Sequence, residues 1–89
     1  LGQFSGHGAQ LSARITGAEH SVRQVADKNP KDAETKQFVA AMNDRLSDLA
    51  TAVTAAESMP SARRRGAHAA IATQLDGIAA DLLARLGLV

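Results

Sequence analysis

The sequence predicts an all-α protein, an antiparallel up-down-up three-helix bundle with helices over residues 9–28, 30–57 and 60–86. First, apolar residues recur at steps of three and four, the spacing of one helical face. Second, the only two prolines, Pro30 and Pro60, divide the chain into three segments of similar length. Third, the sequence has neither the period-two alternation nor the Asn-Gly turn that would indicate a sheet. Two short connections make sequential helices antiparallel.

The 9–28 helix is predicted from a single apolar stripe. Its members follow one another at steps of seven, four, three, four and three: Phe4, Leu11, Ile15, Ala18, Val22 and Val25. The preceding stretch LGQFSGHG contains three glycines. Because glycine disfavours a helix, residues 1–8 are expected to be a flexible N-terminal segment. Gly17 is expected where a neighbouring backbone approaches closely.

The 30–57 helix follows the break DKNPKDAE. Asn29 is the expected cap, and Pro30 suits the first helical position, where its missing N–H leaves no hydrogen bond unmade. The apolar stripe again steps by three and four, with Phe38 at its flank. Its members are Val39, Met42, Leu46, Leu49, Val53 and Ala56.

The 60–86 helix follows the break ESMPSARRR, with Ser58 or Ser61 as the expected cap. Its apolar stripe is wider than the other two. It contains Ile71, Leu75, Ile78, Leu82 and Leu86, is widened by Ala79 and Leu83, and extends backward through His68 and Arg64. Since the first residue is Leu1 and not Met, residues 9–89 are expected to form one domain of a longer protein.

The composition argues against an enzyme. The absence of cysteine excludes thiol catalysis and thiolate metal sites, and is compatible with any compartment. His7, His20 and His68 are separated by 13 and 48 residues, so no two lie at metal-ligand spacing on one helix. The serines have no positioned base, and no glycine-rich phosphate loop precedes a lysine. We therefore predict no catalytic residues, no metal and no cofactor.

Three consecutive arginines, Arg63, Arg64 and Arg65, stand at the expected start of the 60–86 helix. There the helix dipole makes each positive charge unfavourable by about 0.3–1 kcal/mol. Successive helical residues point about 100° apart, so at least one arginine must face solvent. Pairing with Glu57 and Asp48 is the structural interpretation, and an anionic partner is the functional one.

These observations predict a non-catalytic protein–protein interaction domain of the adaptor, docking or effector type. Two binding surfaces are expected, the arginine corner and a groove beside the 60–86 helix. The groove residues are Ala72, Ala79, Leu83 and Leu86. The alternative is a module that binds membrane lipid or a nucleic-acid backbone through Arg63–Arg65. That alternative is less favoured because the net charge is only +1 and no aromatic platform accompanies the arginines. Self-association through small-residue seams stays open.

Overall fold

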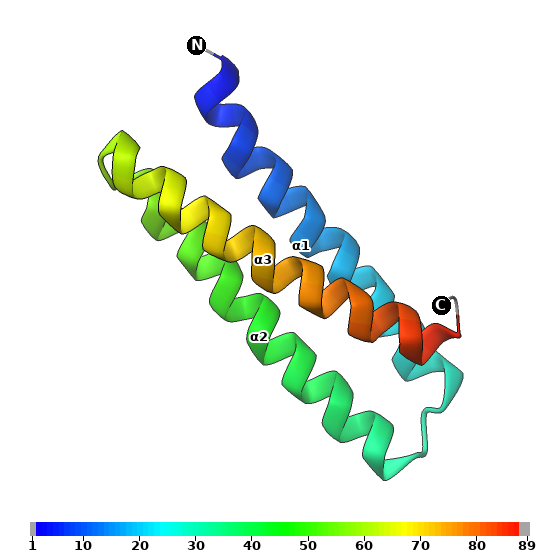
Figure 1. Cartoon of the computed structure of the whole chain (residues 1–89). Coiled ribbons are helices and arrows are strands. Elements are labelled where there is room, and N and C mark those ends of the chain that lie inside the picture. The colour runs from blue at the N-terminus through cyan, green and yellow to red at the C-terminus, as the bar shows by residue number, and fades with distance from the viewer. Residues whose placement is uncertain (1, 88–89) are drawn as a thin grey trace.

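A computed structural model describes the backbone of residues 2–87 and the side chains of residues 8–87. It contains three α-helices, α1 (Gly2–Lys28), α2 (Ala33–Glu57) and α3 (Ser61–Leu86). Each helix packs against the other two, and α3 crosses in front of α1 and α2 in Figure 1. The bundle measures 45 × 21 × 16 Å. The predicted all-α, up-down-up three-helix bundle is confirmed.

The core is made by the three predicted stripes; of the residues predicted for them, the side chain of Phe4 lies outside the described part. Ala56 and Ile78 are its most enclosed members, with exposed fractions of 0%, and Leu46 follows at 1%. Partly buried side chains, among them Phe38 and Ala18, extend it. The buried apolar residues are Leu11, Ile15, Val22, Val25, Met42, Leu46, Leu49, Val53, Ala56, Ile71, Leu75, Ile78 and Leu82. Aliphatic side chains and one alanine therefore provide the packing that holds the helices together.

The first helix begins earlier than expected. α1 starts at Gly2 and not near Ala9, so residues 2–8 of the expected N-terminal segment are helical. A glycine weakens a helix by about 0.5–1 kcal/mol but can adopt helical dihedral angles, so three of them do not forbid it. Gly8 is buried, and a Cβ on it would lie 3.4 Å from Glu57 Oε1. The flexibility of the segment in solution stays a prediction.

The second helix is capped by Asp32, so the expectation of Asn29 as cap and Pro30 as first helical residue is wrong. Asp32 Oδ2 accepts hydrogen bonds of 2.8 Å from both the backbone N–H and the hydroxyl of Thr35. The Asp32 N–H in turn donates to the carbonyl of Asn29 at 3.2 Å, which closes the turn before α2. The N-cap of α2 is therefore the residue whose side-chain oxygen reaches the free backbone N–H of Thr35, and that residue is Asp32.

The third helix has no side-chain cap, so the expectation for Ser58 or Ser61 is also wrong. Pro60 occupies the N-cap position, Ser61 is the first residue of α3, and Ser58 ends α2. At the other end Gly87 has the left-handed conformation, with φ of 73°, that glycine adopts without steric cost. The first turn of α3 consequently combines three arginines with backbone N–H groups that no side chain caps.

We expect Asp32→Ala to lower the melting temperature, and to do so in a pH-dependent way. The hydroxyl of Thr35, and secondly its backbone N–H, lower the pKa of Asp32 by hydrogen bonding to the carboxylate. A lowered folded-state pKa stabilises the fold above the ordinary aspartate pKa, about 3.9, and this contribution is lost as pH falls through the lowered value.

Thermal unfolding of the two proteins across this pH range measures the effect. The difference in melting temperature between wild type and Asp32→Ala should be large near neutral pH and shrink in acid. Thr35→Val, which removes only the hydroxyl donor, should reduce the same difference in part. A difference that is independent of pH would contradict this account.

Candidate functional site

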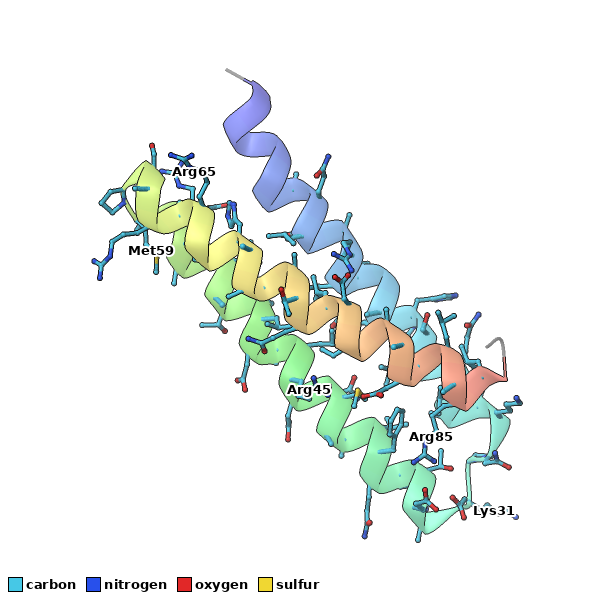
Figure 2. All side chains as sticks on the ribbon, viewed as in Figure 1. Lys31, Arg45, Met59, Arg65 and Arg85 are labelled. Carbon is cyan, nitrogen blue, oxygen red and sulfur yellow. The ribbon has the colours of Figure 1, made fainter. Side chains whose placement is uncertain are left out.

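The three arginines occupy two different environments. Arg64 lies two turns before Ile71 on the core side of α3 and is half-buried. Its Nη2 donates to the carbonyl of Met59 at 3.0 Å, and its buried Nε has no hydrogen-bond partner. Arg63 and Arg65 are exposed, and Figure 2 shows Arg65 projecting at the corner between α2 and α3, near Met59. Arg64 is therefore part of the packing, whereas Arg63 and Arg65 are available at the surface.

The expected pairing of these arginines with Glu57 and Asp48 is not found. Within residues 8–87, the ion pairs join Arg14 to Asp76 at 2.7 Å, Arg45 to Asp81 at 3.8 Å and Arg85 to Glu34 at 2.8 Å. None includes Arg63, Arg64 or Arg65. Glu57 lies beside Gly8 of α1, which explains why the short turn into α3 does not bring it to the arginines.

Arg85, at the opposite end of α3, forms both an ion pair and a contact with an aromatic ring. Its guanidinium pairs with Glu34 and stacks over the ring of Phe38, 4.4 Å from the centroid. Lys28 Nζ donates to the carbonyl of Leu86 at 3.2 Å and neutralises part of the same helix end. Figure 2 places Arg85 at this end of the bundle, near Lys31. The two ends of α3 therefore differ, because among the described side chains Arg85 has an ion-pair partner and Arg63, Arg64 and Arg65 have none.

We expect Arg64→Ala to lower the free energy of unfolding by about 1 kcal/mol, through a lost hydrogen bond and lost stem packing. Arg63→Ala and Arg65→Ala should change it by less than about 0.5 kcal/mol, as exposed positions usually do. Urea unfolding of the three variants, followed by circular dichroism, provides the comparison. Equal effects at all three positions would contradict the division into one structural and two surface arginines.

The four predicted groove residues lie along one narrow stripe of α3, at steps of seven, four and three, but they differ in exposure. Ala72 and Leu86 are half-buried and pack against the core. Ala79 and Leu83 are exposed, and Leu83, with an exposed fraction of 41%, is the one large exposed hydrophobic residue among the described side chains. The wide apolar stripe of α3 is thus partly used by the core, since a helix in a three-helix bundle contacts two neighbours.

A different surface of α3 was missed. With about 100° between successive residues, the positions opposite the buried stripe are occupied only by small, uncharged residues. We call this set the outward face of α3: Ala62, Gly66, Ala69, Thr73, Gly77, Ala80 and Ala84, all exposed. The corresponding outward positions of α1 include His20 and Gln24, and those of α2 include Asp44 and Asp48. The signal available in the sequence was a second period of three and four, made by small residues.

Packing within the chain does not account for the two glycines of this face. A Cβ built on Gly66 or Gly77 would meet nothing within 4 Å. The same holds for Gly17, so the close backbone approach expected there is not made by the described residues of this chain. The hydroxyl of Thr73 donates to the carbonyl of Ala69 at 3.0 Å, so its hydrogen bond is already made within the helix. The outward face therefore offers a smooth surface on which another backbone has room to approach.

A pocket of about 360 Å³ lies beside the turn between α1 and α2. Apolar atoms of Ala26, Pro30 and Val39 form part of its lining, and Asp27 and Lys36 add charges of opposite sign. Thr35 also lines it, and its hydroxyl already donates to Asp32 in the cap of α2. No histidine, serine or cysteine is among the lining residues.

The remaining candidates for chemistry are dispersed. Within residues 8–87, no three His, Cys, Asp or Glu side chains gather closely enough to hold a metal ion. His68 is half-buried and His20 exposed, whereas the side chain of His7 lies outside the described part. None of the helices described between residues 2 and 87 has the length and apolar character needed to cross a membrane.

Comparison with known proteins identifies one family. Its model matches residues 1–89, the whole chain, and its description reads "Family of unknown function (DUF6474)". The chain matches no curated protein and no solved structure.

Proposed function

We propose that the chain, which belongs to the DUF6474 family, is a non-catalytic domain that binds another protein molecule through the outward face of α3. One observation carries this proposal. From Ala62 to Ala84 this face has no charged residue, while the outward positions of α1 and α2 include a histidine and carboxylates. A helix face that only met water would have no need to exclude charge.

Helix packing explains what such a face is suited to bind. Small side chains let two helix axes approach to about 8 Å, at the short end of helix–helix distances. Burying alanine and glycine costs no side-chain conformational entropy. Leu83, exposed at the margin of the face, adds one apolar side chain that a partner can cover. The partner is therefore expected to present a helix that packs lengthwise along this face.

A pair of matched variants tests the proposal. Ala69→Glu introduces a charge into the outward face of α3, and Ala13→Glu introduces the same charge at an exposed position of α1. Affinity capture from a cell extract with the tagged chain should lose specific proteins in the first variant and keep them in the second. Equal capture by the two variants, together with a chain that does not associate with itself, would contradict binding through α3. Circular dichroism of both variants establishes that each remains folded.

A second candidate function is supported by the arginine corner. Arg63 and Arg65 are exposed and have no ion pair among the described side chains, although they stand where the helix dipole disfavours positive charge. We propose, as the alternative, that they bind an anionic phosphate-bearing surface. Sedimentation with vesicles containing phosphatidylserine is the test, with phosphatidylcholine vesicles and duplex DNA as further arms. Binding should weaken with salt and disappear in the Arg63→Ala/Arg65→Ala variant; failure of either would remove this candidate.

A further inference from the structure

We infer that the protein bound by the outward face of α3 is a second copy of this chain, with the two α3 helices packed antiparallel about a two-fold axis at Thr73. This inference rests on the proposed function and names its partner. Three independent features of α3 support it: the order of its small residues, the charges at the two edges of the face, and the available space at the glycines.

The small residues are arranged symmetrically around Thr73. Ala69 and Gly77 lie four residues before and after it, Gly66 and Ala80 lie seven, and Ala62 and Ala84 lie eleven. In an antiparallel two-fold pair, a residue a given distance before the axis meets the residue the same distance after it in the partner. Every member of the face therefore meets a small residue, over about 33 Å at 1.5 Å per residue.

In this register each glycine of the outward face meets an alanine of the second copy. Gly66 of one copy meets Ala80 of the other, and Gly77 meets Ala69. A Cβ on either glycine would meet none of the described residues within 4 Å, so the helix leaves room there for a second backbone. A glycine opposite an alanine lets the two backbones approach more closely than two alanines would, which increases dispersion contacts along the seam.

The charges at one edge of the face favour the antiparallel arrangement. Arg63 and Asp81 are 18 residues apart, which is five helical turns, so both lie on the same edge. Arg63 is ten residues before the axis and Asp81 eight after it, so they are offset by about 3 Å in the pair, within the reach of an arginine. Among the described side chains, Arg63 has no ion pair and Asp81 has only the 3.8 Å contact to Arg45. In parallel packing the same edge of the two copies would lie on opposite sides of the seam, so Arg63 would not meet Asp81.

At the other edge of the outward face, an arginine stem meets an apolar side chain. Arg65 and Leu83 are also 18 residues apart, so the same relation brings Arg65 of one copy beside Leu83 of the other. The aliphatic stem of the arginine would cover the one large exposed hydrophobic residue of the described part. A single helix pair buries less than the roughly 1,200 Å² of total surface typical of stable complexes, so the dimer should be weak.

Sedimentation equilibrium of the 89-residue chain, from micromolar into the millimolar range, tests the association. We expect a dimer that dissociates on dilution. Ala69→Glu, which also approaches Asp76 of the second copy, should weaken dimerisation by about tenfold or more, because it places an unpaired charge in the seam. Ala13→Glu on α1 should dimerise like the wild type. A monomer at the highest concentration, or equal dimerisation of both variants, would overturn the inference.

Charge exchange tests the edge pairing. Arg63→Asp and Asp81→Arg should each weaken the dimer, because each places like charges opposite one another in the pair. The Arg63→Asp/Asp81→Arg double variant should recover dimerisation. Failure of the double variant to recover, in a protein whose circular dichroism is unchanged, would overturn the proposed register.

Cysteine cross-linking tests the orientation, since the chain has no cysteine of its own. Thr73→Cys places a thiol at the two-fold axis, where it meets its own copy closely enough to form a disulfide. Ala62→Cys lies on the same face, but its own copy would be about 33 Å away. Mild oxidation should link the first variant and not the second. Efficient linkage of both would indicate parallel packing and overturn the inference, as would linkage of neither.

The failure of this inference can be distinguished from the failure of the proposed function. If the chain stays monomeric but Ala69→Glu still loses proteins that Ala13→Glu captures, α3 binds a different protein and only self-association is wrong. If the chain is monomeric and both variants capture the same proteins, binding through α3 is wrong as well.

Discussion

Leu75→Ala is expected to lower the free energy of unfolding by about 2–5 kcal/mol, the largest single effect that we anticipate. Leu75 lies in the middle of α3, has an exposed fraction of 2% and belongs to the core shared by the three helices. Its truncation removes apolar contacts and leaves a cavity that the surrounding helices fill only in part. Small domains have only about 5–15 kcal/mol of stability in total, so this loss is a large fraction of it.

Leu83→Ala is the matched control, because it makes the same substitution on the same helix at the exposed margin. With 41% of Leu83 exposed, its truncation should cost less than about 1 kcal/mol. Urea unfolding followed by circular dichroism, at a concentration where each chain is monomeric, measures both values. Similar losses for the two leucines would contradict the assignment of Leu75 to the core and Leu83 to the surface.

The Gly66→Ala/Gly77→Ala double variant is expected to raise the free energy of unfolding of the monomer by about 1–2 kcal/mol. Each glycine interrupts the interior of α3, where alanine is better by about 0.5–1 kcal/mol. A Cβ at either position would meet nothing within 4 Å, so no clash offsets the gain. Thermal and urea unfolding of dilute protein give the measurement.

Gly87→Ala provides the opposite control for that double variant. Gly87 has a φ of 73°, where a side chain is disfavoured, so the same substitution should lower stability there by about 1 kcal/mol. Destabilisation by Gly66→Ala/Gly77→Ala in dilute solution would show that the monomer does need the two glycines. The double variant should not gain dimer affinity, since its added methyl groups occupy the room proposed for the second copy.

The prediction of fold from sequence succeeded because apolar spacing is a local property. Steps of three and four in each segment define a face whether or not its partners are known, and the residues predicted for the three stripes largely became the core. The two prolines marked the corners for a similar reason, since proline restricts the backbone without reference to distant residues. What stayed imprecise was the start of each helix, because several polar residues precede it in the sequence and only the folded backbone decides which of them, Asp32 for α2 and none for α3, caps it.

The candidate site depended more on tertiary structure. The sequence alone determined that three arginines in succession cannot face one side, and that small residues recur along 60–86. Only the packed bundle decided which arginine is half-buried, that Glu57 lies beside Gly8, and that the core absorbs Ala72 and Leu86. The physical reason is that burial and charge pairing depend on the distances between helices. A periodic stripe in the sequence shows which side of a helix a residue occupies, but not which residues of the other helices it contacts.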